Sequence, residues 1–161
     1  MTEIKYKKSL ILILLFSIFA LIAAYFIQYI LGHQPCNLCL IERIPYLSAL
    51  IIISFCLFFN KFKKICLIVL ALIFFSAALI SFYHFGIEQE FIKESLVCDL
   101  KNGDKILTTE ELLKELKEKT ISCKDVTFKI FGFSLATINT LISLILSVIT
   151  FRMYLNYEKK K

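Results

Sequence analysis

The chain has 161 residues, of which 58% are hydrophobic, with only 4 glycines, 2 prolines and no tryptophan. A soluble domain of this length needs far more polar surface, so the composition excludes an ordinary water-soluble protein and indicates a membrane protein. The net charge of +6 could suggest nucleic-acid binding. However, the sequence has no basic patch with interleaved aromatic residues, and we set nucleic acid aside as a partner.

Four apolar stretches approach or reach the length that crosses a bilayer. The first, third and fourth exceed the roughly 18 apolar residues typical of a spanning helix. The second reaches this length only if its helix starts upstream of Arg43, near residues 38–41. We therefore predict an all-α membrane protein, a four-transmembrane-helix bundle in a single integral membrane domain, 1–161. The expected spans are about 9–31, 40–59, 65–85 and 130–151, with outer loops at about 32–43 and 86–129.

The distribution of basic residues predicts the orientation of the spans. If the spans alternate, ten basic residues share one side, namely Lys5, Lys7, Lys8, Lys61, Lys63, Lys64, Arg152, Lys159, Lys160 and Lys161. The short connection on the opposite side carries a single arginine. By the positive-inside bias, both termini are expected on the cytoplasmic side, with the two loops outside. A cleaved signal peptide is disfavoured because the first apolar run exceeds the 7–15 residues of a typical h-region.

A Cys-x-x-Cys motif, Cys36 to Cys39, lies between the first two spans, with Pro35 before it and Arg43 after it. Proline suits the start of a helix, and the N-terminus of a helix stabilises a thiolate. Pro45 leaves two alternatives open. Either the second span starts near Ile44 and the motif lies in a loop, or the helix starts earlier and kinks. The second alternative, which we favour, places both cysteines and Arg43 on one helix face.

The longer outer loop contains Cys98 and Cys123. Between them, Asn102-Gly103 indicates a turn, and 108–111 resembles a capping box that opens a small helix over about 109–119. This helix has a leucine-rich side, so it is either solvated with a modest packing face or lies on the membrane surface.

Several polar groups and thiols occur inside or at the ends of spans. Cys56 and Cys66 flank the cytoplasmic turn, and we expect them to pack as free thiols because the cytoplasm is reducing. Gln28 is expected to bond to a neighbouring helix, and so are five residues of the fourth span: Ser134, Thr137, Asn139, Thr140 and Ser143. His84 is an interface anchor or a hydrogen-bond donor to a cofactor near Arg43.

The four outer cysteines allow three interpretations. A zinc site is disfavoured because only one of the two pairs is closely spaced, and we expect no metal. A structural scaffold explains a bridge between Cys98 and Cys123, but a Cys-x-x-Cys loop closes too little chain to stabilise much. In the third interpretation the two pairs form a relay. Electrons then enter from an external thiol protein and leave from Cys36 and Cys39 to a lipid-soluble quinone, whose developing charge Arg43 could stabilise.

The segment Pro35-Cys36-Asn37-Leu38-Cys39-Leu40-Ile41-Glu42-Arg43 resembles the Pro-Cys-x-Leu-Cys-x-x-Glu-Arg segment of the DsbB family of disulfide bond formation proteins. The order of spans, loops and cysteines extends this resemblance over essentially the whole chain. The stretch 83–88 is similar to the Tyr-His-x-Gly-x-Glu seen after the third span in some members. The vitamin K epoxide reductase family differs because its Cys-x-x-Cys follows the loop pair.

The resemblance implies a membrane thiol:quinone oxidoreductase that sustains disulfide bond formation. Cys98 would form a mixed disulfide with a DsbA-like thioredoxin-fold oxidase, and Cys123 would pair transiently with Cys36. Cys39 would then face the quinone, a ubiquinone or menaquinone, in a thiolate–quinone complex with Arg43 positioning the ring. Catalytic residues would therefore be Cys36, Cys39, Cys98 and Cys123, and cofactor-binding residues Arg43 and His84.

Overall fold

The computed structural model describes residues 3–59, 62–93, 98, 122–124, 129–130 and 132–158. Its helices are α1 (Glu3–Tyr29), α2 (Asn37–Ile41), α3 (Ile44–Phe58), α4 (Lys63–Glu88) and α6 (Leu135–Glu158), and a short hairpin joins β1 (Lys129–Ile130) to β2 (Phe133–Ser134). Among the described residues, four stretches are long and apolar enough to span a membrane: Tyr6–Tyr29, Asn37–Phe58, Lys63–Glu88 and Leu135–Tyr157. The predicted all-α fold with four spanning helices is confirmed.

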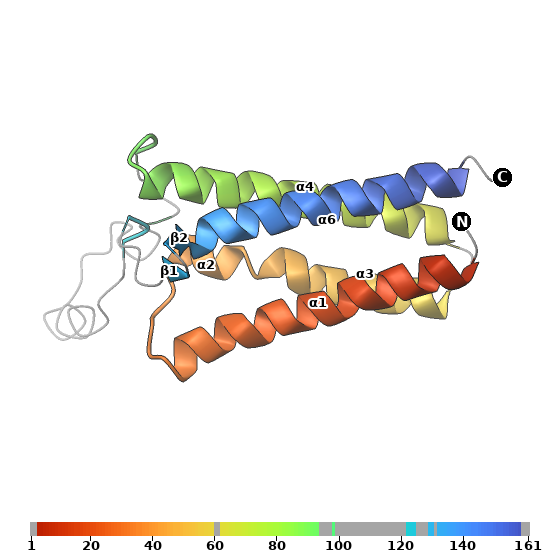
Figure 1. Ribbon diagram of the computed structural model, residues 1–161, viewed down its shortest axis with the longest axis horizontal. Helices are drawn as coiled ribbons and strands as arrows, with labels where there is room; N and C mark the ends of the chain where they lie inside the picture. Colours follow the sequence, from red (N-terminus) through yellow and green to blue (C-terminus); the bar gives the residue numbers. More distant parts are fainter. Residues whose placement is uncertain are drawn as a thin grey trace, which may run out of the picture.

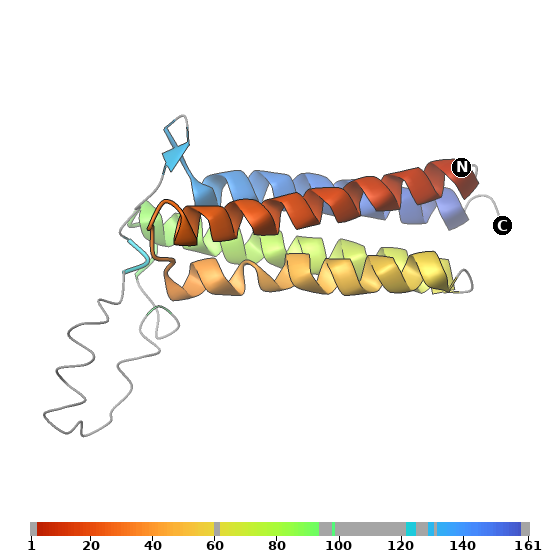
Figure 2. The ribbon, with the colours of Figure 1, turned by 90° about the horizontal axis from the view of Figure 1, so that it is seen from below.

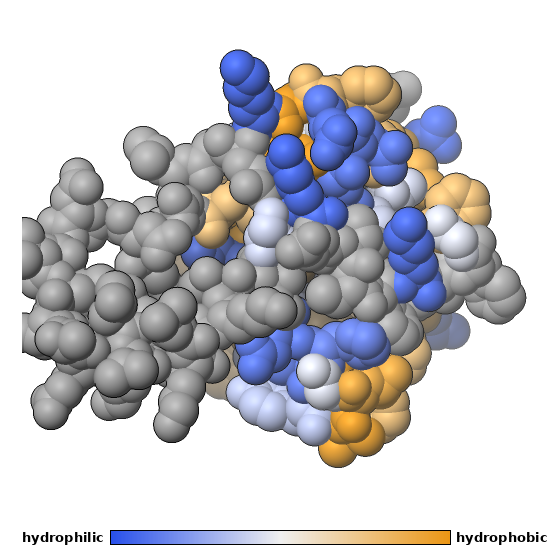
Figure 3. Space-filling model, turned by 90° about the vertical axis from the view of Figure 1, so that its left-hand side faces the viewer, coloured by the Kyte–Doolittle hydropathy of each residue, from blue (hydrophilic) through white to orange (hydrophobic). Residues whose placement is uncertain are grey.

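The long helices run side by side along the longest axis of the molecule (Figures 1 and 2). α1 begins and α6 ends at the same end of the bundle, whereas α2 and the β1–β2 hairpin lie at the other end. Figure 3 looks onto the α2 end, where hydrophilic residues gather and hydrophobic residues lie towards the margin. The cysteine motif therefore lies at the end of the bundle opposite the two termini.

The second span is one membrane crossing built from two helices. Its first helix, α2, starts directly after Cys36, and α3 resumes at Ile44 with Pro45 in its first turn. Proline has no N–H for an intrahelical bond and its ring clashes with the carbonyl four residues earlier, so the helix is interrupted just before it. Here Arg43 N donates to Leu40 O at 3.2 Å, three rather than four residues back. The favoured alternative, an early start with a kink, is thus confirmed.

Small side chains line the contact between α4 and α6, the most extensive helix pair in the bundle. Ala71, Ala77 and Ala78 are buried on α4, and Ala136 and Ser147 are buried on α6. The Ser147 hydroxyl donates across the interface to the Ala71 carbonyl at 3.1 Å. Lipid is as apolar as these helices, so close packing of small residues and interhelical hydrogen bonds hold them together.

Polar side chains of α6 divide into two groups. Asn139 and Ser143 contact Tyr46 of α3, as predicted for bonds across the bundle. Thr140 instead donates to the Ala136 carbonyl of its own helix at 2.8 Å, so the prediction of a cross-bundle bond was wrong for this residue. A threonine hydroxyl can bond to the carbonyl one turn back without any neighbour.

Two features at opposite ends of the bundle differ from expectation. Cys56 and Cys66 are joined by a disulfide, so the prediction of free packed thiols was wrong. The two residues face each other across the α3–α4 turn with their Cα atoms 6.2 Å apart, within disulfide range. At the other end, the β1–β2 hairpin was not predicted, because two-residue strands leave no periodic signal. The helix predicted at about 109–119 lies outside the described residues.

Replacing Ala71 by leucine tests the close packing of α4 against α6. Ala71 is 5% exposed and its carbonyl accepts from Ser147 of α6, so the added atoms should push the two helices apart and destabilise the bundle by about 1–3 kcal/mol. Reversible unfolding in mixed detergent and dodecyl sulfate micelles measures the change. Leu79→Phe adds bulk on the same helix at a position 55% exposed to lipid and should leave the midpoint unchanged. Equal effects of both variants would contradict this account.

Candidate functional site

Cys36 and Cys39 form a close pair at the start of α2. Both are free thiols, with their sulfur atoms 2.7 Å apart. Cys36 is the N-cap of the helix, and its sulfur accepts a hydrogen bond from the Cys39 backbone N–H at 3.2 Å. The sequence places Pro35 just before this cap, as expected for a helix that starts at the motif. The first cysteine therefore occupies the position where free N–H groups stabilise negative charge.

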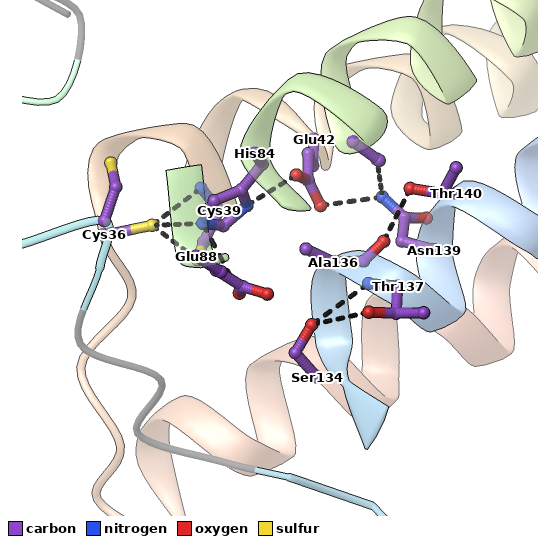
Figure 4. A network of polar contacts seen from close by, with 12 residues as sticks. Cys36, Cys39, Glu42, His84, Glu88, Ser134, Ala136, Thr137, Asn139 and Thr140 are labelled. Atoms are coloured by element: carbon purple, nitrogen blue, oxygen red, sulfur yellow. Dashed lines mark hydrogen bonds and ion pairs between the residues drawn. The ribbon is translucent and has the colours of Figure 1, made fainter. Parts of the chain in front are cut away.

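His84 of α4 lies between Cys36 and Glu42 (Figure 4). Its Nε2 is 3.5 Å from the Cys36 sulfur, and its Nδ1 is 2.7 Å from Glu42 Oε1. His84 is 3% exposed and Glu42 8% exposed, so this contact is shielded from solvent. The sequence offered His84 as an interface anchor or as a hydrogen-bond donor to a cofactor. Its hydrogen bonds here go to the first cysteine and to a glutamate of the same motif, and the cofactor contact stays a prediction.

Asn139 of α6 continues the polar chain into the bundle. Its Nδ2 donates to Glu42 Oε2 at 2.8 Å and to the Ser81 hydroxyl at 2.6 Å, and its Oδ1 accepts from Tyr46. Both carboxylate oxygens of Glu42 are therefore bonded, one by α4 and one by α6. Buried polar groups in a span are costly unless they are paired, so this network holds the second span, α4 and α6 together around the cysteines.

The surroundings of Cys36 lower its pKa to about 5. The largest cause is the hydrogen bond from the Cys39 thiol. Burial acts in the opposite direction, and the hydrogen bond and charge of His84 lower the pKa further. In the reduced pair, Cys36 is therefore the thiolate at neutral pH.

Arg43 points toward the first helix. Its Nη1 donates to Gln28 Oε1 at 2.6 Å, and its guanidinium lies over the Tyr25 ring, 4.9 Å from the centroid. This confirms the prediction that Gln28 bonds to a neighbouring helix. α1 thus holds one N–H edge of the guanidinium through Gln28 and one face through Tyr25, which fixes the direction of the remaining N–H groups.

The second cysteine pair lies against the first. Cys98 and Cys123 are joined by a disulfide, and Asn37 Nδ2 donates to the Cys98 carbonyl at 3.2 Å. Cys123 is 2% exposed and packs in one cluster with Cys36, Leu38 and Ile87. The four cysteines singled out in the sequence, about 90 residues apart at their extremes, therefore meet at one end of the bundle.

A cavity of about 340 Å³ adjoins the cysteines inside the bundle. Its walls are mostly apolar, and α1 contributes Phe16, Phe19, Ala20, Ala23, Ala24 and Ile27. Its polar groups include both thiols of the motif, Glu42, Arg43, His84 and Glu88. Phe19 is 68% exposed, so the cavity wall reaches the outer surface of the bundle. An apolar pocket with a few convergent polar groups is the usual form of a small-molecule site.

Sequence reasoning singled out neither Glu42 nor Glu88 as a site residue. Glu88 Oε1 lies 3.8 Å from His84 Nε2, one helical turn along α4. The i, i+4 spacing of 84 and 88 was the available signal. Gly86, between them, packs closely on Ile92: a Cβ at Gly86 would lie 2.7 Å from the Ile92 Cδ1 atom, so the end of that side chain would have to shift.

Together, the fold and this site define a multi-pass membrane protein that carries a reactive dithiol between a second cysteine pair and an apolar cavity. The family model described as Disulfide bond formation protein DsbB matches residues 6–153. The chain belongs to the DsbB family, and it is a membrane oxidoreductase of disulfide formation. It is 29% identical over 148 residues to Uncharacterized protein RP370 of Rickettsia prowazekii (strain Madrid E), covering 89% of this chain and 85% of that protein. No solved structure matches the chain.

His84→Gln should raise the pH at which Cys36 becomes reactive. The lowered pKa keeps wild-type Cys36 ionised well below neutral pH, so its alkylation should fall off only towards about pH 5. Without the His84 contact, the fall should begin at higher pH. Mass spectrometry of reduced protein alkylated at graded pH measures this. His33→Gln, in the other histidine of the chain, serves as the matched control. Identical profiles for His84→Gln and wild type would exclude the contribution of His84.

Proposed function

We propose that the protein is a thiol:quinone oxidoreductase that reoxidises a DsbA-like thioredoxin-fold oxidase and passes the electrons to a membrane quinone. The observation that carries this proposal is the position of the Cys36–Cys39 pair. It packs against the Cys98–Cys123 disulfide and also lines an apolar cavity inside the bundle. A dithiol placed in this way can receive electrons from the aqueous side and release them to an apolar acceptor.

Electrons would enter by a series of exchanges of thiol for disulfide. A thiolate of the reduced partner attacks Cys98, and Cys123 leaves as a thiolate. Cys123 then attacks Cys36 of an oxidised Cys36–Cys39 pair, and Cys39 leaves. The partner's second thiolate attacks its bond to Cys98, which releases the oxidised partner and the Cys98 thiolate. Cys98 finally attacks Cys123, so the Cys98–Cys123 disulfide closes, Cys36 leaves, and both electrons stay on the Cys36–Cys39 dithiol. The observed arrangement, with the loop pair oxidised and the motif pair reduced, corresponds to the stage at which this dithiol holds the electrons.

The cavity suits a quinone of either class, ubiquinone or menaquinone. Its volume of about 340 Å³ lies within the range of small-molecule sites, and its apolar wall on α1 suits an isoprenoid chain. When bound, a quinone would accept two electrons and two protons and leave the site as a quinol. Arg43, anchored by Gln28, would orient the quinone carbonyl groups. The burial of Cys36 and His84 keeps water away from the Cys36 sulfur.

The proposed location is the bacterial cytoplasmic membrane, with both termini in the cytoplasm and the redox loops in the periplasm. The α3–α4 turn and both terminal helix ends lie at one end of the bundle (Figure 1). Lys63 and Lys64 lie at this end, over the rings of Tyr6 and Tyr154. Basic residues at the cytoplasmic side set the orientation of membrane proteins.

Cys39→Ser tests the route of the electrons. The variant cannot close the motif disulfide, so reduced thioredoxin-fold partner should no longer reduce quinone, and quinone absorbance should stay constant. Its Cys36 thiolate can still attack Cys123 of the loop disulfide, with Cys98 as the leaving group, so a Cys36–Cys123 disulfide should accumulate, which non-reducing peptide mapping detects. Cys66→Ser, at the far end of the bundle, should turn over as wild type does. Quinone reduction at the wild-type rate by Cys39→Ser would refute the relay.

Arg43→His tests the proposed contact with quinone. Loss of a hydrogen bond to a charged donor costs about 1.5–3 kcal/mol, so the apparent KM for quinone should rise by roughly tenfold or more. Gln28→Ala should act in the same direction by a smaller factor, because it releases Arg43 without removing it. Steady-state kinetics at varied quinone measures both. An unchanged KM together with a lower melting temperature would make Arg43 a structural anchor only.

A further inference from the structure

The reduced motif pair, together with His84, has the geometry of a metal-ligand set. The Cys36 and Cys39 sulfur atoms and an imidazole nitrogen of His84 all lie within 4.8 Å of one another. A close Cys-x-x-Cys pair is the spacing with which many zinc sites begin. For the four outer cysteines zinc is disfavoured, because only one of their two pairs is closely spaced. The present ligand set is different, because His84 of α4 replaces the second cysteine pair.

Glu88 offers the fourth ligand. Its Oε1 is 3.8 Å from His84 Nε2, its side chain is 6% exposed, and its Oε2 is a buried oxygen with no hydrogen-bond partner among the described residues. Glu88 lines the same cavity as Cys36, Cys39 and His84. A buried carboxylate oxygen without a partner is costly, and a cation bound between Glu88 and the thiolates would remove that cost.

Glu42 prepares His84 for such a role. Glu42 Oε1 is 2.7 Å from Nδ1, so that nitrogen keeps its proton, and Nε2, which faces the Cys36 sulfur, would give up its proton to bind the ion. A carboxylate behind a histidine is the usual support of a metal-bound imidazole, since it fixes both the tautomer and the ring orientation. Asn139 holds the other oxygen of Glu42, so the support is itself fixed.

We propose that Cys36, Cys39, His84 and Glu88 bind a divalent transition-metal ion of the zinc class in the dithiol state. Two thiolates, one imidazole and one carboxylate match the ligand preference of Zn²⁺ and disfavour Mg²⁺ and Ca²⁺. Binding would displace the remaining thiol protons to solvent. Sulfur ligands of a tetrahedral zinc ion lie about 3.8 Å apart. The two sulfur atoms, now 2.7 Å apart, therefore separate by about 1 Å on binding.

The site is specific for the reduced protein. In a Cys36–Cys39 disulfide no thiolate is available, so the ion is released on oxidation. Conversely, thiolates held by the ion can neither close their own disulfide nor attack the Cys98–Cys123 disulfide. This inference rests on the proposed function: the bound metal ion would slow the transfer of electrons from the Cys36–Cys39 dithiol to the quinone.

Cobalt(II) provides a direct optical test. The full-length protein in detergent is reduced, freed of reductant under anaerobic conditions and titrated with Co²⁺ alone. A thiolate-to-cobalt charge-transfer band with the visible bands of a tetrahedral ion is expected, and Zn²⁺ should abolish it because it binds more tightly. The bands should be absent from Cys36→Ser/Cys39→Ser and retained in Cys98→Ser/Cys123→Ser.

The α4 ligands have a matched control close by. Glu88→Gln and His84→Ala should weaken cobalt binding by roughly tenfold or more. Glu90→Gln, whose side chain is 78% exposed, should leave it unchanged. Failure of the reduced wild type to give the bands, their persistence in Cys36→Ser/Cys39→Ser, or equal effects at 88 and 90 would overturn the proposal. Quinone reduction in metal-free buffer is measured separately, so failure of the metal site and failure of the proposed function are distinguishable.

Discussion

The reactive end of the molecule depends on one buried carboxylate, that of Glu42. It lies in a membrane span, where a charged group without partners is strongly disfavoured. His84 of α4 binds one of its oxygens and Asn139 of α6 binds the other. Both partners come from other helices, so the position of α4 and α6 around the motif is determined by the need to satisfy this single group. The same contact directs His84 toward Cys36, which links the packing of the bundle to the reactivity of the thiol.

The interruption of the second span lets neighbouring residues serve different sides of the site. Glu42 points toward α4 and α6, whereas Arg43 bonds to Gln28 and Tyr25 of α1. Pro45 causes the interruption, because it removes one intrahelical hydrogen bond just after the motif. The proline thus contributes to the site without approaching a cysteine.

Much of this architecture could be predicted from local sequence. Apolar runs of spanning length predicted the four helices, and Pro35 predicted a helix that starts at the Cys-x-x-Cys pair. The contacts of His84 could not be predicted in the same way. Glu42 and His84 are 42 residues apart, and only the packing of α4 beside α2 shows that they bond. Periodicity identifies which face of a helix is apolar, but it does not identify the partner that a polar side chain meets.

The disulfide between Cys56 and Cys66 shows a different limit of prediction from sequence. The prediction of free thiols was based on the redox state of a compartment, which says nothing about how closely two residues approach. The α3–α4 turn brings their Cα atoms within 6.2 Å. The same limit applies to His84. Its place at the end of a span suggested an anchor or a cofactor ligand, whereas its contacts with Cys36 and Glu42 are made only in the folded chain.

The cavity has a further consequence for how an apolar molecule would reach the cysteines. α1 packs chiefly on α3, and α6 packs chiefly on α4, while both α1 and α6 contribute walls to the cavity. Exposed Phe19 belongs to that wall, so the cavity can be entered from the side, out of the hydrocarbon layer. Occupancy would then follow the mole fraction of the molecule among the lipids and would be insensitive to the volume of surrounding water. Diluting the membranes with buffer would leave occupancy unchanged, whereas diluting them with added lipid would lower it.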